Sequence, residues 1–236
     1  MIPKFAGSTV ALLAFATLLP AASDASDPGE KTELWNELRI TAKWSDRVDL
    51  IAAGALRFED NFSVMNRASL QLGLNLRPMP WLTFTPNYQY IAHDPAEDVR
   101  THEHRPGLLT AVRIPIERAE ITLSTGIEYR IRENKEDSWR VRPKVKVEHP
   151  FGPEQWNLSG YTADELFYDS SANEFVHNRF FFGIEKKVAT NWSANIYYCR
   201  QHDLQGRKPD LDIIGVSIGV RFDLARAERR SQPAEK

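Results

Sequence analysis

Basic side chains stand at every second position of residues 140–149, RVRPKVKVEH. Successive side chains of an extended chain point to opposite faces, so Arg140, Arg142, Lys144 and Lys146 share one face and the intervening valines and proline share the other. Guanidinium and ammonium groups on one surface can bind anions or pair with carboxylates. In a soluble sandwich the valines would pack into a core, whereas in a transmembrane barrel they would face lipid and the charges would face the lumen.

The other residues that could do chemistry lack the partners that their reactions need. Ser217 in GVSIG matches a nucleophile elbow, but such a serine lies on a strand-to-helix turn and no helix follows here. His102 and His104 are two imidazoles, where a zinc site needs three or four ligands, and His149 has no base or acid beside it on its own face. The single cysteine, Cys199, has no partner for an internal disulfide. We therefore expect no catalytic residue, no metal and no cofactor.

Apolar and polar residues alternate over most of the chain. In residues 70–90 two alternating runs flank the proline-rich stretch RPMP, which predicts a short turn. The same pattern predicts eleven strands and no helix, at residues 33–44, 48–59, 66–77, 81–93, 104–116, 119–132, 138–149, 154–168, 175–188, 191–202 and 211–224. A bacterial barrel that starts and ends in the periplasm needs an even number of strands. We therefore expect an antiparallel up-and-down transmembrane β-barrel of 10 to 12 strands, with ten or twelve favoured and 33–44 as the odd strand.

Strand and loop lengths favour a membrane barrel over a soluble sheet. The predicted strands have about 10 to 14 residues, against about 5 to 6 in soluble sheets and about 9 to 11 across a bilayer. Short connections alternate with longer polar ones, and aromatic residues such as Trp44, Trp81 and Trp139 fall near strand ends, where interfacial girdles form. After residue 26 no apolar run approaches the roughly 20 residues of a spanning helix, so any insertion must use strands.

The ends of the chain predict export and a single domain. Residues 1–25 resemble a cleavable signal peptide, because Lys4 precedes an apolar stretch that small residues follow. We expect residues 26–32 to form a short periplasmic lead, residues 33–224 the outer-membrane barrel, and residues 225–236 a charged flexible tail. The formal net charge of −2 argues against a nucleic-acid partner.

Alternation places a largely basic set of residues on the inward face of such a barrel. These lumen-facing charged residues are Arg57, Arg105, Arg113, Glu128, Arg130, Arg132, Arg140, Arg142, Lys144, Lys146, Glu165, Arg179 and Glu185, and the same face receives Arg67, Arg77, Glu148 and Arg221. Long arginines could fill a small barrel by pairing with Glu128, Glu165 and Glu185. An open lumen would instead favour small anions, because fixed positive charge in a low-dielectric wall focuses the field along the axis.

The last predicted strand carries a pattern for membrane assembly. Ser217, Gly219, Phe222 and Leu224 fit polar-x-Gly-x-x-apolar-x-apolar. The pattern resembles the terminal-strand signal that the outer-membrane barrel assembly machinery reads, although the usual terminal aromatic residue is missing. We expect this machinery and outer-membrane lipids as partners, and the bacterial outer membrane as the location.

Several segments resemble a known family. LWNELRI, ALRF, EYRIR followed by WRVRPKV, DELF and NRFFFGIEKK are similar to segments of uncharacterised bacterial outer-membrane barrels that are known only as a domain of unknown function. The resemblance covers nearly the whole chain after the signal peptide, and it implies a barrel and a location but no activity. The family's recurrent polar positions correspond to Arg57, Arg130, Arg132, Arg140, Arg142, Glu165 and Arg179.

Three functions are compatible with the sequence. The favoured one is a non-enzymatic outer-membrane barrel that acts as a narrow, anion-favouring pore or as a lumen-filled structural protein. The second is a lipid-modifying enzyme of the deacylase or phospholipase type, for which Ser217 and His149 are the residues that can be named. The third is a soluble periplasmic barrel or sandwich that binds a small ligand, because alternation alone does not distinguish lipid from a core.

Overall fold

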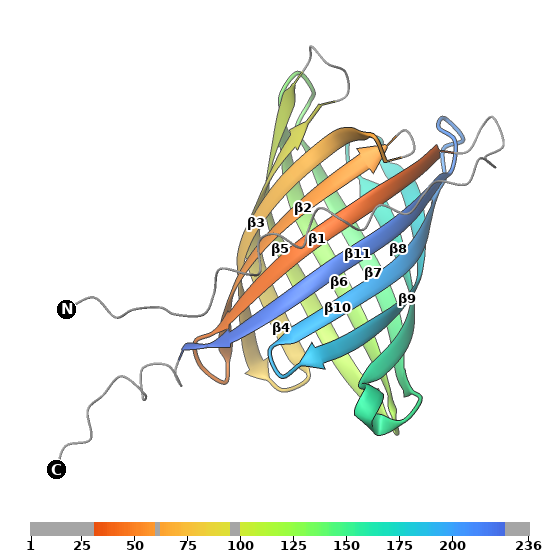
Figure 1. Ribbon diagram of the computed structural model, residues 1–236. Coiled ribbons are helices and arrows are strands. Elements are labelled where there is room, and N and C mark those ends of the chain that lie inside the picture. The colour runs from red at the N-terminus through yellow and green to blue at the C-terminus, as the bar shows by residue number, and fades with distance from the viewer. Residues whose placement is uncertain (1–30, 60–61, 95–99, 225–236) are drawn as a thin grey trace, which may run out of the picture.

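The computed structural model describes residues 31–59, 62–94 and 100–224. The predicted signal peptide (1–25) and the predicted tail (225–236) lie outside the described residues, as does all but the end of the predicted periplasmic lead. The described chain forms one closed β-barrel, which confirms the predicted all-β barrel fold (Figure 1).

The barrel has eleven strands that are joined mostly by tight connections. They are β1 (Lys31–Lys43), β2 (Val48–Glu59), β3 (Val64–Met79), β4 (Leu82–His93), β5 (Thr101–Ile116), β6 (Ala119–Arg132), β7 (Ser138–Phe151), β8 (Leu158–Asp169), β9 (Glu174–Ala189), β10 (Trp192–Asp203) and β11 (Leu211–Asp223). Within the described residues no helix is long and apolar enough to cross a membrane.

The barrel closes through a parallel pair of strands. Every strand pairs in antiparallel fashion with its neighbours in the sequence, and β1 pairs in parallel with β11, from Lys31 opposite Leu211 to Lys43 opposite Asp223. An odd number of strands joined by hairpins leaves the first and last strands pointing the same way, so their pairing must be parallel. The count of eleven lies within the predicted range. The preference for an even number was wrong, because the segment at residues 33–44 is a full member of the barrel.

Most predicted strand ends lie within three residues of those observed, and two of the differences have a clear structural cause. RPMP was predicted to be a turn, but β3 continues through Pro78 to Met79, and the register between β3 and β4 shifts there. Proline is tolerated at such an irregularity because it has no ladder hydrogen bond to donate. The strand predicted from residue 154 begins at Leu158, because the 3-10 helix η2 (Glu154–Trp156) precedes it and Asn157 adopts a positive φ of 49°.

The two ends of the barrel carry different connections. At one end β3–β4, β5–β6 and β9–β10 are each joined by two residues, and we call this the short-turn end. At the other, the long-loop end, β4–β5 and β10–β11 are each joined by seven residues. β1 starts at the long-loop end and β11 finishes at the short-turn end, because these two strands run in the same direction.

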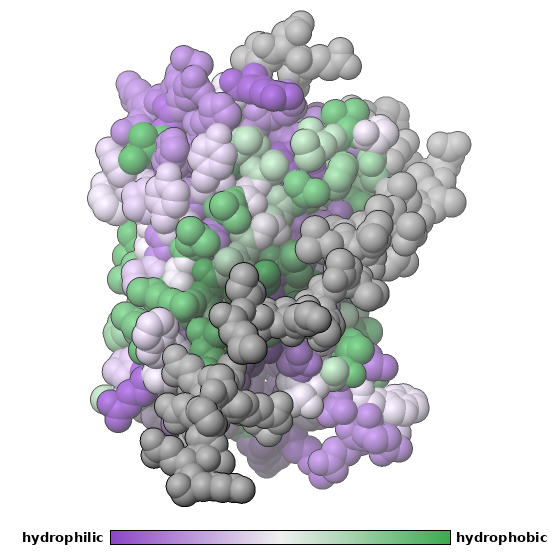
Figure 2. All heavy atoms as spheres, turned by 60° about the vertical axis from the view of Figure 1, so that its left-hand side comes forward, coloured by the Kyte–Doolittle hydropathy of each residue, from purple (hydrophilic) through white to green (hydrophobic). Residues whose placement is uncertain are grey.

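The outer wall of the barrel is apolar over the middle of its strands. Ile196, for example, lies at the centre of β10 between Ile184 of β9 and Val216 of β11, and it is 62% exposed. Other large apolar side chains exposed on the outer wall are Leu70, Leu72, Leu74, Tyr88, Leu108, Ile127, Val145, Phe180, Phe182 and Ile214. Figure 2 shows one side of the barrel, where apolar side chains gather across the middle and hydrophilic ones lie at the two ends.

Candidate functional site

The inner face of the barrel carries the charged residues that alternation singled out. All thirteen of the charged residues predicted to face the lumen stand at the alternating strand positions that share this face. Arg105, Glu128 and Glu165 are buried among them, whereas Arg113 stands near the strand end and is exposed. The alternation therefore places these charges inside one barrel. Whether they can bind a ligand depends on which of them form ion pairs with each other.

Ion pairs join the charges on β5, β6, β7 and β8. Glu103, which is 2% exposed, accepts two hydrogen bonds from Arg105, at 2.8 and 2.9 Å, and one from Nε of Arg130 at 2.5 Å. Asp169 accepts hydrogen bonds from Nη1 of Arg130 at 2.7 Å and from Nη2 of Arg140 at 2.9 Å. Two carboxylates thus share three guanidinium groups, which leaves one net positive charge in this set.

Glu128 and Glu165, which were expected to pair with the lumen arginines, form fewer and mostly longer ion pairs than Glu103 and Asp169. Arg142 lies 2.7 Å from Glu128 and 3.9 Å from Glu165, and Arg105 lies 3.8 Å from Glu128. Glu185 forms no ion pair with any residue that the structure describes. The main acidic partners are therefore Glu103 and Asp169, neither of which was singled out as a lumen residue from the sequence.

A separate set of ion pairs lies toward the short-turn end. Asp49 is fully buried and lies 2.6 Å from Arg77 and 3.2 Å from Arg221. Lys146 lies 2.6 Å from Glu148. These contacts lie on the inner wall between the middle of the barrel and its short turns.

A basic cavity of about 1130 Å³ occupies the lumen at the long-loop end. Among the described residues that line it, eleven are Lys or Arg and six are Asp or Glu. Cavity walls with an excess of one charge concentrate ions of the opposite sign. We call this space the basic cavity, and its net positive wall suits an anion.

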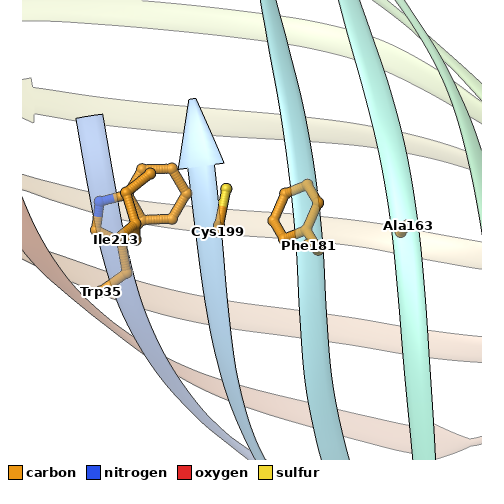
Figure 3. Close-up of a cluster of buried hydrophobic side chains, with 5 residues drawn as sticks. All are labelled: Trp35, Ala163, Phe181, Cys199 and Ile213. Carbon is orange, nitrogen blue, oxygen red and sulfur yellow. The ribbon is translucent and has the colours of Figure 1, made fainter. Parts of the chain in front are cut away.

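Apolar side chains form the floor of the basic cavity on one side. Trp35, Ile213, Cys199, Phe181 and Ala163 lie in a row across β1, β11, β10, β9 and β8 (Figure 3). Cys199 and Ile213 are fully buried although they point inward. Neighbouring side chains therefore cover this part of the inner wall.

Three arginines that line the basic cavity have no acidic partner. Arg57, Arg67 and Arg179, which we call the arginine cluster, are half-buried and form no ion pair with any described residue. Arg57 lies over the ring of Trp35 at 3.5 Å from its centroid, and Arg179 lies 4.9 Å from the centroid of the same residue. Arg67 stands directly opposite Arg57 in the pairing of β2 with β3. The cluster thus gathers three positive charges from three strands, and two of the three lie against the ring of Trp35.

The residues considered for catalysis or metal binding are not brought together. Ser217 points into the lumen, where it accepts a hydrogen bond from Asn195, whereas His149 belongs to the opposite, outward face of its strand. His102 and His104 also lie on the outer wall, beside tyrosines of β4, while Glu103 between them points inward. In residues 31–59, 62–94 and 100–224 no three His, Cys, Asp or Glu side chains are grouped so that they could hold a metal.

The residues of the predicted assembly signal divide between the two faces of β11 and its end. Ser217 and Gly219 lie on the inner face, and a Cβ added at Gly219 would lie only 2.6 Å from the Ser193 hydroxyl oxygen. Phe222 and Leu224 are exposed. The spacing therefore presents two apolar side chains at the short-turn end of the last strand.

The sequence contained a signal for two residues that were missed. Glu103 stands two positions before Arg105, so alternation already placed it on the inner face, but its position between two histidines drew attention to metal binding. Trp35 alternates with Glu33 and Glu37 in β1, which puts its ring inside the barrel. A large aromatic residue between inward-facing charged residues is the sequence signal that could have identified Trp35.

A comparison with models of protein families gives one match. Residues 32–210 match a family described as "Protein of unknown function (DUF2490)". A comparison with curated proteins found no match to the chain.

Proposed function

The chain belongs to this family of proteins of unknown function, and we propose that it is a lumen-filled barrel of the bacterial outer membrane whose basic cavity receives anions from one side. Membrane placement, a lumen that does not conduct, and the anionic ligand are all parts of this proposal. The protein is a barrel of undetermined role, and the following observations support this function over the others.

The outer wall supports the placement in a membrane. A soluble barrel of this kind would expose apolar side chains along strand after strand, and soluble monomers rarely expose contiguous apolar patches larger than a few hundred Å². The exposed leucines of β3 and the exposed isoleucines and phenylalanines of β9 and β10 fit contact with lipid instead. The observed strand lengths of 12 to 16 residues are also sufficient to cross a bilayer at a tilt.

Buried inward-facing side chains below the basic cavity support a closed cavity that receives a ligand over an open pore. The basic cavity is lined by residues of the long-loop half, and directly beneath it Cys199 and Ile213 retain no exposed surface. On another part of the wall, inward-facing Ile91 is 1% exposed. An anion that enters from the long-loop end therefore meets a floor of packed side chains.

Fractionation and conductance test the two parts of this proposal separately. We expect the protein to remain in the membrane fraction after a carbonate wash, and the purified barrel to insert into planar bilayers without steady conductance. Release by carbonate would refute the membrane placement and favour a soluble barrel. Reproducible current steps with an anion-selective reversal potential would refute the filled lumen and favour the pore.

A further inference from the structure

The arginine cluster contains charges that form no ion pair with a described carboxylate. Glu33 and Glu165 act electrostatically on Arg57 and Arg179, but from beyond ion-pair distance. Within the described residues Arg57 makes no hydrogen bond, and its one contact of note is the ring of Trp35. Arg67 donates a long hydrogen bond of 3.4 Å to His93, and Arg179 donates one of 2.8 Å to Gln201. All of these partners are uncharged when His93 accepts through Nδ1.

Such a cluster costs free energy when nothing else is bound. Like charges that are close together repel, and removing each guanidinium from bulk water adds a desolvation cost. On the other side of the same cavity, ion pairs with Glu103 and Asp169 offset this repulsion and desolvation for Arg105, Arg130 and Arg140. No equivalent carboxylate is within ion-pair distance of the arginine cluster among the described residues, so an anion from outside the chain is its natural partner.

We propose that the arginine cluster binds a phosphate group carried by an organic ligand. Three guanidinium groups from β2, β3 and β9 can donate to a tetrahedral oxyanion from different directions, and a guanidinium can bind phosphate through two parallel hydrogen bonds. Trp35 contacts Arg57 and Arg179 through its ring, and the ring centroid of Phe167 lies 4.5 Å from Arg179, so cation–π contacts hold two of the three guanidinium groups in place.

The size of the basic cavity indicates a ligand larger than free phosphate. Pockets for small organic molecules have volumes of about 300 to 1,000 Å³. The cavity, at about 1130 Å³, has room for a phosphate and for the group that carries it. This inference rests on the receiving role proposed above and names the chemistry of the ligand. A soluble phosphate monoester and a lipid headgroup share that chemistry, so the test includes both.

Calorimetric titration of the full refolded chain in detergent micelles tests this site. The probes are glucose 6-phosphate, inorganic phosphate and a short-chain phosphatidic acid, with glucose as the uncharged control. We expect Arg57→Gln, Arg67→Gln and Arg179→Gln each to weaken phosphate-ester binding about tenfold or more. Arg113→Gln is the matched control, because Arg113 shares the inner face but does not line the basic cavity, and it should bind like the wild type.

Tryptophan fluorescence gives a second reading that identifies the place of binding. Glucose 6-phosphate should change the emission of the wild type but not that of Trp35→Phe, because the phosphate would bind Arg57 and Arg179, which lie against that ring. Heat-modifiable gel mobility shows that each variant is folded. Binding of phosphatidic acid alone would assign the phosphate to lipid, and binding of glucose 6-phosphate would assign it to a soluble ester.

Two results would overturn the phosphate site. One is a folded wild type that binds none of the three phosphate probes saturably, and the other is an equal loss of affinity in Arg113→Gln. A barrel that resists carbonate and does not conduct, yet ignores every phosphate probe, would remove this inference while the membrane placement and filled lumen stand. A protein that binds phosphate but is released from membranes by carbonate would keep the phosphate site and remove the membrane placement.

Discussion

Glu103→Gln tests whether the ion pairs of the lumen are structural. The carboxylate is 2% exposed and accepts hydrogen bonds from two guanidinium groups. Glutamine keeps the shape and one acceptor oxygen but loses the charge, and its NH₂ group faces donors. Removing one partner of a buried ion pair costs about 3 to 5 kcal/mol. We expect about 3 kcal/mol, at the lower end, because the remaining oxygen still accepts one bond. That is a change of roughly 100-fold in the folding equilibrium.

Urea unfolding of the barrel in lipid vesicles, followed by tryptophan fluorescence, measures this change. Glu120→Gln is the control, because Glu120 is exposed near the short-turn end of β6, and its effect should stay within about 0.5 kcal/mol. Adding Arg105→Gln to Glu103→Gln should recover part of the loss, since one unpaired guanidinium is removed. If Glu103→Gln is no more destabilising than Glu120→Gln, the network does not stabilise the fold and the reasoning is refuted.

Three further predictions concern the wall and its packing. Ile196→Arg, at the centre of the outer wall, should destabilise the barrel in lipid by about 2 to 4 kcal/mol, and an unchanged urea midpoint would place that position in water. Gly215→Ala should destabilise by about 1 to 3 kcal/mol in the same assay, because its Cβ would lie 1.9 Å from the ring of Tyr197, whereas Gly54→Ala, with open space around it, should not. Cys199 is fully buried, so a polar maleimide should label it only after unfolding, and labelling of the folded protein would show that water reaches the filled level of the lumen.

Alternation predicted most of the fold because each strand has one apolar and one polar face. It located eleven segments that match the observed strands within a few residues, and the residues it placed inward share the inner face. It did not reveal how the barrel closes. Parallel pairing of β1 with β11 depends on a register between the two ends of the chain, and neither strand carries a local mark of that partner. The rule of even strand number was therefore applied to a barrel that does not obey it.

The pairing of the inward charges was the less predictable part of the site. Alternation puts Arg130, Arg132, Arg140 and Arg142 on the inner face of the neighbouring strands β6 and β7, and Arg130 and Arg140 share Asp169. Arg132 instead donates a hydrogen bond to the main chain of the β6–β7 connection. Which side chains meet in a lumen depends on the stagger of strands that are not neighbours. Alternation predicts the face on which each side chain lies, but not which side chains touch across the barrel.

The difference between the two sides of the basic cavity is the strongest argument for a ligand. A barrel that needed only a filled lumen could use apolar side chains or complete ion pairs throughout, because a buried charge without a partner destabilises the fold. The chain gives Arg105, Arg130 and Arg140 direct ion pairs with Glu103 and Asp169, yet it gives Arg57, Arg67 and Arg179 none with any described residue. Proteins depart from self-consistent packing mainly at functional sites. Because the three arginines of the cluster all line the basic cavity at the long-loop end, an anion that enters there would pair with charges that have no ion-pair partner among the described residues.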